Sequence, residues 1–367
     1  MSENLVCFSD SRNKVEIAFR DYMNHYMSEV RGKSGYIYDK NISLTEKDKK
    51  INDLMRKEIS RLSGLDMSDN SNISQVMYSN HPSFKWAAFA VINSLIDMVL
   101  PDVLDKSVGI YSEQRFGQFG DSFAFEVKPN DLFYVSKAGR DQRTVEFQRQ
   151  FNGMVTIVPE NREITVFVNF YRVLCGMDSM ADFVSKAILS LEASIARETY
   201  MAFDTATDDL PTTPVDGELH LTGGFDQKAA VKLAQRVSAF NNGMPAVFVG
   251  TKSALSEIMP ADANYRYTLD SEYVRMGYIR NAFGFDVIEL DQIADWQNPY
   301  KVTLNDSKIY VMSPSSQKIV KVCYEGNAYT NVVNARESAN LTETTTINKS
   351  YGIGIATNSI VGVIDLE

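Results

Sequence analysis

The sequence predicts an α+β fold, because the hydrophobic period changes along the chain. Apolar residues recur at helical spacing over the first part, alternate with polar residues over residues 121–172, and then occur in alternating helical and strand segments. With 367 residues, 44% hydrophobic and 23% charged, the chain has the composition of a globular protein with one large or two ordinary domains. This excludes a wholly disordered chain and a small disulfide-stabilised one.

The net charge and the small numbers of histidines and cysteines disfavour several classes of function. The 47 acidic and 37 basic residues give a net charge of −10, which makes tight wrapping of nucleic acid a poor hypothesis. The count of three histidines disfavours metal sites and histidine catalysis. The cysteines Cys7, Cys175 and Cys323 are odd in number and far apart, which indicates a reducing compartment. The N-terminus does not resemble a secretory signal, because it has no basic start and no long apolar run.

Two amphipathic helices are expected in the N-terminal part. The first ends at Gly32. The second begins at Ser43, where Glu46 completes a capping box, and a further glycine at position 64 ends it. Both apolar stripes are narrow, so these helices should pack on something else, either this chain or a neighbouring subunit. Residues 66–80 are rich in serine and asparagine and are expected to be a linker.

The most apolar stretch is residues 86–100. It contains Asn93, Ser94 and Asp97, and it is shorter than the roughly 20 apolar residues that a membrane span needs. We expect a buried helix that ends at Pro101, and no membrane partner.

Residues 121–172 are expected to form an extended β excursion. The alternation around Phe123 and Phe125 predicts one strand, residues 132–135 a second, and the turn at residues 159–162 a hairpin. The polar segment 136–150 has few residues that could fill a core. Its charged side chains are the candidate contacts between subunits: Lys137, Arg140, Asp141, Arg143 and Arg149.

Ser179 opens the longest predicted helix, with Asp182 suited to the positive end of the helix dipole. It should run to about Thr205, roughly 40 Å at 1.5 Å per residue, as a structural spine. An α/β region follows. Its expected helices are residues 226–240, one that begins at 251, and 272–281; its expected strands are 245–249, 285–290 and 308–312. The chain should then return to strands over 318–324 and 351–366, the latter with a hairpin turn at 357–358.

A search for catalytic, cofactor and metal motifs yields none. Gly352 and Gly354 are a near miss for a dinucleotide loop, because the last glycine and the following helix are absent. The loop at residues 221–224 is best interpreted as a plain turn. The remaining polar candidates are assigned structural or surface roles: His25, His81, His220, the pair Glu160 and Glu163, and the group Asp204, Asp208 and Asp209, for which a hard-cation site is the alternative.

Three passages carry a resemblance to a known family. Val166–Val173 leading into Met180–Glu192 resembles the passage from an extended loop into a spine helix. Ala246–Leu255 and Tyr278–Leu290 are similar to the strand and helix steps of an apical domain. With the order of the elements, the chain resembles the major capsid proteins of tailed bacteriophages (Caudoviricetes), which have the Hong Kong 97-type (HK97-like) fold. The resemblance covers about residues 85–366, and the first 80 match only loosely.

The resemblance implies a division of the chain and a function. The expected parts are an N-terminal helical arm (1–80), a peripheral domain in three pieces (81–120, 173–222 and 318–367), the extended β-loop (121–172) and an axial α/β domain (223–317). The implied function is non-enzymatic self-assembly into pentamers and hexamers that form an icosahedral virion shell, built in the host bacterial cytoplasm around double-stranded DNA that it contacts weakly. Scaffold, portal and decoration proteins are the further partners that it implies.

Several alternatives stay open at this point. One is an encapsulin-like nanocompartment shell that holds a cargo enzyme. Another is a cytosolic enzyme whose active-site residues are too dispersed for any motif. Within the capsid interpretation, residues 1–80 are either a retained arm, which their caps and apolar stripes favour, or a scaffolding segment that a protease removes.

Overall fold

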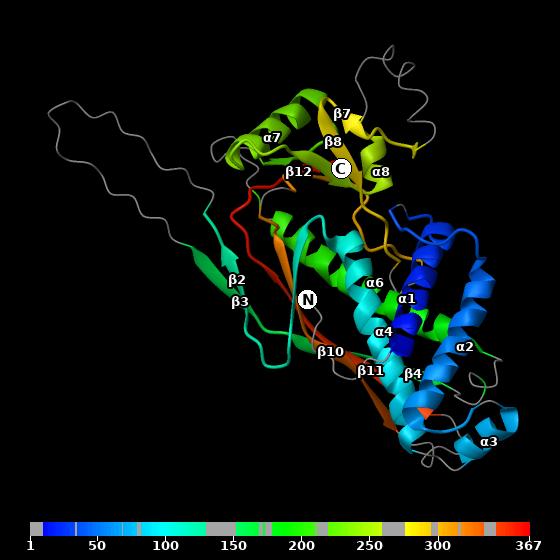
Figure 1. The fold of residues 1–367 in the computed structure, drawn as a ribbon. Helices are drawn as coiled ribbons and strands as arrows, with labels where there is room; N and C mark the ends of the chain where they lie inside the picture. The colour runs from blue at the N-terminus through cyan, green and yellow to red at the C-terminus, as the bar shows by residue number, and fades with distance from the viewer. Residues whose placement is uncertain are drawn as a thin grey trace.

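The computed structural model describes residues 10–33, 35–67, 69–78, 82–129, 152–168, 172, 178–208, 210, 219–258, 276–294, 300–314, 317–333 and 343–367. Within these residues the fold is α+β, as the sequence predicts. Long helices lie beside a four-stranded sheet, and a smaller α/β part built on a six-stranded sheet sits at one end and carries the C-terminus (Figure 1).

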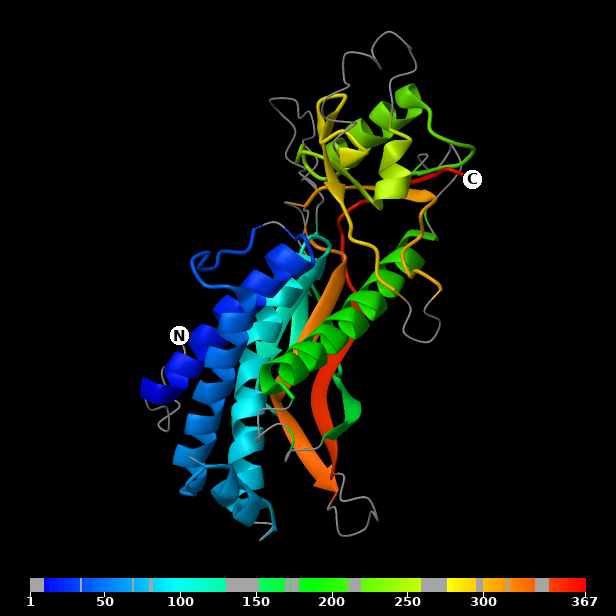
Figure 2. The same cartoon turned by 90° about the vertical axis from the view of Figure 1, so that its right-hand side faces the viewer.

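The N-terminal helices pack on the same chain. They are α1 (Asp10–His25), a short π-helix (Tyr26–Val30), α2 (Leu44–Ser63) and α3 (Asn70–Tyr78). Phe19, Met23 and Met55 are fully buried, because α1 and α2 contact each other and α4 (Pro82–Val108). Figure 2 shows α1, α2 and α4 side by side. The structure thus shows packing on this chain, and contact of these helices with a neighbouring subunit stays a prediction.

The capping signals place α2 correctly. The Ser43 hydroxyl accepts a bond from the Glu46 amide, the Glu46 carboxylate accepts one from the Ser43 amide, and Gly64 ends the helix at φ +69°.

Two expectations for this part are wrong. The supposed linker at residues 66–80 contains α3, which forms because Ile73 and Val76 have an apolar surface to bury against. Helix α4 does not end at Pro101 but continues to Val108. The predicted burial of α4 is confirmed: it is long and apolar enough to cross a membrane, yet most of its apolar stretch is buried within the molecule.

The four-stranded sheet has the order β1-β10-β11-β4, with β1 parallel to β10 and the other pairs antiparallel. The strands are β1 (Ser112–Gly117), β4 (Glu160–Val168), β10 (Val320–Val333) and β11 (Glu343–Ile355). Figure 2 shows α6 (Met180–Asp208) crossing the long strands β10 and β11. Because α4 and α6 cover this sheet, its central strands lie in the main hydrophobic core.

Strands β2 (Phe123–Val127) and β3 (Gly153–Ile157) form a separate two-stranded ribbon that projects from the body (Figure 1). The expected hairpin across residues 159–162 is therefore wrong, because β3 pairs with β2 and β4 pairs with β11. The chain changes sheets at this point instead of folding back on itself. The expected strand at residues 132–135 lies outside the described residues.

Helix α6 confirms the predicted spine. The Ser179 hydroxyl accepts a bond from the Asp182 amide at 3.1 Å, and the helix runs for 29 residues. One face is buried along its whole length, from Val184 to Phe203, so α6 packs against elements from most of the chain.

The α/β part is a six-stranded sheet of order β5-β12-β9-β6-β8-β7 with α7 and α8 packed on it. Its elements are β5 (His220–Leu221), α7 (Gln227–Phe240), β6 (Val247–Gly250), α8 (Lys252–Ser256), β7 (Asn281–Ala282), β8 (Phe285–Glu289), β9 (Lys308–Met312) and β12 (Gly362–Asp365).

Most predicted elements of this part are present, with two corrections. The expected hairpin at residues 357–358 is wrong, since β11 lies in the four-stranded sheet and β12 in the six-stranded one. The expected third helix at 272–281 is not formed as predicted: Asn281, its last residue, begins the short strand β7 and residues 277–280 are not helical, whereas residues 272–275 lie outside the described residues.

Candidate assembly surface and spine-helix junction

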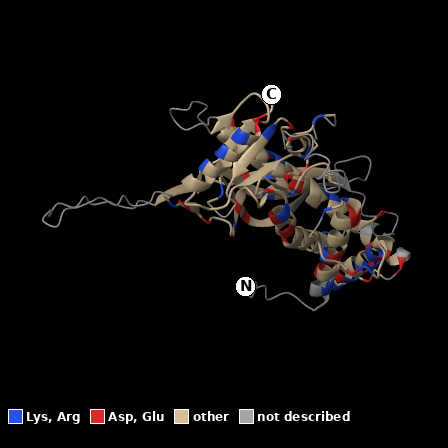
Figure 3. Cartoon of the chain, turned by 90° about the horizontal axis from the view of Figure 1, so that it is seen from above, with Lys and Arg blue, Asp and Glu red and all other residues tan. Residues whose placement is uncertain are grey.

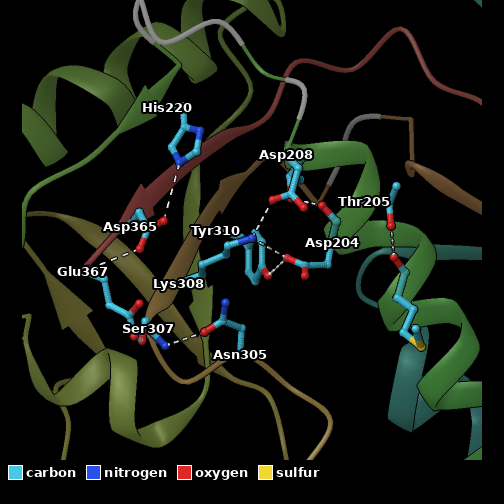
Figure 4. Close-up of polar contacts among 12 residues, drawn as sticks. Asp204, Thr205, Asp208, His220, Asn305, Ser307, Lys308, Tyr310, Asp365 and Glu367 are labelled. Carbon is cyan, nitrogen blue, oxygen red and sulfur yellow. Dashed lines mark hydrogen bonds and ion pairs between the residues drawn. The ribbon is translucent and has the colours of Figure 1, made fainter.

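The C-terminal end of α6 is held on the six-stranded sheet by Lys308, the first residue of β9. Its Nζ lies 3.0 Å from Asp204 Oδ1 and 2.6 Å from Asp208 Oδ1 (Figure 4). The two aspartates are four residues apart and share a face of α6, so both reach the same ammonium group. The cation between these aspartates is thus a lysine of the same chain. Asp209, the third member of the proposed group, lies outside the described residues.

Two buried tyrosines complete this junction. The Tyr310 hydroxyl donates to Asp204 Oδ1 at 2.6 Å and lies 3.0 Å from the Tyr200 hydroxyl, which accepts a bond from the Asn305 amide at 2.8 Å. Burial raises the pKa of Tyr310, so it stays a neutral donor at ordinary pH. Burial also lowers the pKa of Lys308, but its bonds to Asp208 and Asp204 outweigh that effect and leave the pKa raised. The junction is therefore a charged, fully bonded link between α6 and the α/β part.

The projecting ribbon is the candidate assembly surface. One face is closed by a small apolar cluster of Phe123, Phe125, Ile157 and Cys323. Beyond that cluster, the exposed fraction is 74% for Met154 and 76% for Val158. A two-stranded ribbon is marginally stable by itself, and exposed apolar side chains on it favour contact with another surface.

The five sequence-predicted site residues are not brought together by any described contact. Lys137, Arg140, Asp141, Arg143 and Arg149 all lie outside the described residues. They fall in the sequence between the end of β2 and the start of β3, so the ribbon is the part of the described structure that leads to them.

The glycine pair of the near-miss dinucleotide motif has a packing role. Gly352 and Gly354 lie in β11, under the corner where β3 leads into β4. A Cβ on Gly352 would lie 2.7 Å from the Val158 carbonyl oxygen, and one on Gly354 would lie 2.8 Å from the Ile157 side chain. Small residues are needed here because two chain segments cross at close range.

The other candidates have structural surroundings. His25 is buried, stacks on Tyr38 with ring centres 4.4 Å apart, and has Nε2 2.8 Å from Glu29 Oε2. His220 lies in β5 with Nε2 3.9 Å from Asp365 Oδ2 (Figure 4). Glu160 is exposed and pairs with Arg162. The predicted burial of Cys323 is confirmed, whereas Cys7, Cys175 and His81 lie outside the described residues.

No group of three or more metal-binding side chains occurs within the part of the chain that the structure describes. Acidic and basic residues are interspersed over the N-terminal helices (Figure 3). Because both signs of charge are mixed there, these helices present no single-sign patch that would attract a polyanionic partner, and the mixed charge favours solubility.

Sequence reasoning missed the buried ion pairs that tie distant elements together. Lys308, Glu192 on α6 and Lys349 on β11 are all buried and paired. A usable signal was present in two cases, because Asp97 and Glu192 each interrupt an otherwise apolar helical face. A buried carboxylate needs a cationic or hydrogen-bonding partner, although the pattern cannot say which one.

Comparisons with known proteins give likenesses of structure only. No family model matches the chain, and no curated protein matches it in sequence, whereas 178 solved chains match its structure. One is the mature capsid of bacteriophage PhiM1, with TM-score 0.49 and 10% identity, over 70% of this chain and 85% of that one. Another is the capsid of a native GTA particle, with TM-score 0.46 and 16% identity, over 71% and 89%.

A virus-like particle from Pyrococcus furiosus is similar with TM-score 0.41 and 9% identity, over 74% of this chain and 98% of that one. The structure of this chain is thus partly similar to subunits of solved capsids and of a virus-like particle. At these identities the likeness concerns the fold alone.

Proposed function

We propose that this chain is a major capsid protein of a tailed bacteriophage, which assembles through pentamers and hexamers into an icosahedral head around double-stranded DNA. The observation that supports this most directly is the ribbon of β2 and β3. It leaves the body of the subunit and keeps Met154 and Val158 largely exposed. Exposed apolar side chains lower the solubility of a lone subunit. Their burial against a neighbouring subunit is favourable and stabilises the assembly.

The four-stranded sheet supports the same proposal. Its two outer strands, β1 and β4, have no partner on their outer side within the described residues. Free strand edges promote pairing with another chain, and a closed symmetric assembly is the ordinary way to satisfy repeated contacts of this kind.

The domain division expected from the sequence is proposed with changed bounds: β5 and β12 move from the peripheral to the axial domain, and β4 moves from the extended β-loop to the peripheral domain, because of the sheets in which they lie. The six-stranded sheet corresponds to the proposed axial domain, and α4, α6 and the four-stranded sheet correspond to the peripheral domain. The first 80 residues are proposed as a retained helical layer of the peripheral domain, because α1 and α2 are buried against it. Scaffold, portal and decoration proteins are proposed partners, the virion is the proposed location, and the role is structural.

The deciding experiment is electron microscopy of the purified chain, together with its mass by light scattering. We expect shells, or rings of five and six subunits. Replacing Met154 by glutamate, with Val158→Glu as a second variant, should block assembly and leave the subunit folded, because a charge cannot be buried in an apolar contact. Met201→Glu is the matched control, since Met201 is exposed on α6, away from the ribbon.

The sequence-predicted contacts provide an independent test. Reversing charge with Arg140→Glu and Arg143→Glu should prevent assembly while the circular dichroism of the subunit is unchanged. Normal shells from that double variant would exclude these residues as contacts. A parent chain that stays a monomer or dimer on concentration would overturn the capsid proposal, and shells that enclose a protein cargo with no DNA would replace it by a nanocompartment.

A further inference from the structure

Helix α7 carries a row of basic side chains and no acidic one. Its 14 residues include Lys228, Lys232 and Arg236, each four positions after the one before. Because residues four apart share one face of a helix, the three cations form a row about 12 Å long at 1.5 Å per residue. We call these three side chains the α7 row.

The α7 row lies on the side of the α/β part that is turned away from α6. Tyr310 of β9 belongs to the main hydrophobic core with α6, whereas its neighbours Ile309 and Val311 belong to a second core with α7. Since successive side chains of a strand point to opposite faces, the six-stranded sheet separates α7 from α6 (Figure 1). Lys228 and Lys232 are exposed, so a large partner can reach them.

A groove lies beside the α7 row. Its volume is about 590 Å³, and its lining includes all three cations together with the apolar Val231 and Leu221 of β5. Among the described residues that line it, the acidic one is Asp226, whose carboxylate accepts a hydrogen bond from the Ala229 amide at 3.0 Å as the N-cap of α7. The positive end of the helix dipole partly offsets that charge. The groove and the row thus form a cationic surface.

A regular row of one sign of charge is complementary to a uniformly charged polymer. Acidic and basic residues are interspersed over the N-terminal helices (Figure 3), so a second copy that presented those helices would repel the row as well as attract it. Each strand of double-stranded DNA carries one phosphate per 3.4 Å of helix axis, and a row of 12 Å therefore spans about three or four phosphates. Lysine and arginine are usual partners of phosphate oxygens.

We propose that the α7 row binds the phosphate backbone of double-stranded DNA without regard to sequence. The inference rests on the proposed function for the source of that DNA, and it identifies the face of the subunit that contacts the packaged duplex. Because the chain as a whole has a net charge of −10, the contact is local and weak. Three neutralised phosphates give a slope of about −2.7 when the logarithm of the association constant is plotted against the logarithm of the salt concentration.

The test is binding to a short, fluorescently labelled duplex, followed by fluorescence anisotropy. The protein is the full chain with Met154→Glu, purified by gel filtration as single subunits. In this parent, a fourfold rise in salt concentration should lower the association constant roughly 40-fold. The double variant Lys228→Gln with Lys232→Gln should bind at least about tenfold more weakly at low salt, and its salt slope should be about a third of the parent value.

The matched control is Lys49→Gln with Lys57→Gln. Both lysines are exposed on α2, and their replacement changes the net charge by the same amount. Glutamine is a good helix former, so both double variants should keep the circular dichroism of the parent. The control should bind the duplex as the parent does. Equal weakening in the two double variants, an α7 variant that binds like the parent, or a parent that does not bind at low salt would each overturn the proposal.

Shell formation separates this inference from the proposed function. In a chain that keeps Met154, the α7 double variant should still form shells in electron micrographs. If it stops shell formation and leaves duplex binding unchanged, the α7 row contacts a neighbouring copy, which overturns this inference and leaves the capsid proposal standing. If the parent forms no shells, the capsid proposal fails, and the anisotropy measurement still decides whether the α7 row binds DNA.

Discussion

Asp97, in the middle of the most apolar helix, accepts a hydrogen bond from the ammonium of Lys349 at 2.9 Å, across 252 residues of sequence. The Ala328 amide also donates a bifurcated hydrogen bond to both carboxylate oxygens of Asp97, at the point where β10 and β11 change register. Burial raises the pKa of Asp97, and the Lys349 charge partly offsets this. The pair fixes α4 against the irregular part of the sheet.

Removing this carboxylate should be costly. In Asp97→Ala the ammonium of Lys349, which is 6% exposed, loses its anionic partner, and an uncompensated buried charge costs about 3 kcal/mol. We expect that loss in the free energy of unfolding by urea denaturation. Asp102→Ala is the control on the same helix. Asp102 pairs with Arg20 where both are exposed, so its loss should be below about 1 kcal/mol. Equal losses of unfolding free energy in the two variants would show that the buried Asp97–Lys349 pair contributes no more than the exposed Asp102–Arg20 pair.

Lys308→Met tests the spine-helix junction. The substitution keeps most of the unbranched side chain but leaves Asp204 and Asp208 without their cation. We expect a destabilisation of about 2 kcal/mol, below the full value because Asp208 is partly solvated. The surface variant Lys186→Met should change stability by less than about 0.5 kcal/mol. Thermal unfolding followed by circular dichroism measures both. A Lys308 variant as stable as the parent would contradict a stabilising role for the junction.

Gly352→Ala tests the crossing of β3 over β11. The added Cβ would meet the Val158 carbonyl oxygen at 2.7 Å, and backbone at that range must move, so we expect a loss of about 2 kcal/mol. Gly153→Ala lies in the same ribbon, where the nearest atom to the new Cβ is 3.6 Å away, and it should be tolerated. The urea midpoints of the two variants give the comparison. Tolerance of both would mean that the corner can shift freely.

Stability should fall between pH 10 and pH 12. Burial is the main cause that raises the pKa of Tyr22 and Tyr36 from 10.0 to about 12. The unfolded chain therefore loses these protons first, so their contribution is fully present below pH 10 and is lost as pH rises through about 12. Each group adds a slope of about 1.4 kcal/mol per pH unit. The raised pKa of Lys308 acts in the same direction.

The measurement is urea unfolding across this pH range, with tyrosinate absorbance as the second probe. Tyr22→Phe removes one titrating group, so the unfolding free energy should fall less steeply with pH, by about 1.4 kcal/mol per pH unit. A slope that is unaffected by this substitution would show that Tyr22 titrates alike in both states.

Helices were predictable from this sequence because their signals are local. Ser43 with Glu46, Ser179 with Asp182, and Asp226 before α7 each mark a start that the structure confirms by a side-chain bond to the backbone. The errors at residues 66–80 and at Pro101 arose because buried contacts outweighed local composition.

The positions of most strands were predictable from the sequence, but the strands with which they pair were not. The pairs that sequence suggested, β3 with β4 and β11 with β12, are neighbours along the chain, whereas the observed partners of β4 and β12 are β11 and the pair β5 and β9. Such pairing depends on which surfaces α4 and α6 cover, which no local pattern encodes. The same limit explains why the pairings of Lys308 and Lys349 were missed, since each contacts its aspartate across 100 residues or more.

The order of strands also has a consequence for folding during synthesis. β1 pairs in parallel with β10, and Glu113 contacts Lys321 across 208 residues. The chain then returns to the six-stranded sheet for its final strand, β12. The four-stranded sheet cannot be completed until β11 has left the ribosome, and the six-stranded sheet cannot be completed until β12 has. We therefore expect folding that is slow and mainly post-translational, as for other proteins dominated by distant contacts, with a need for chaperone protection of the nascent chain.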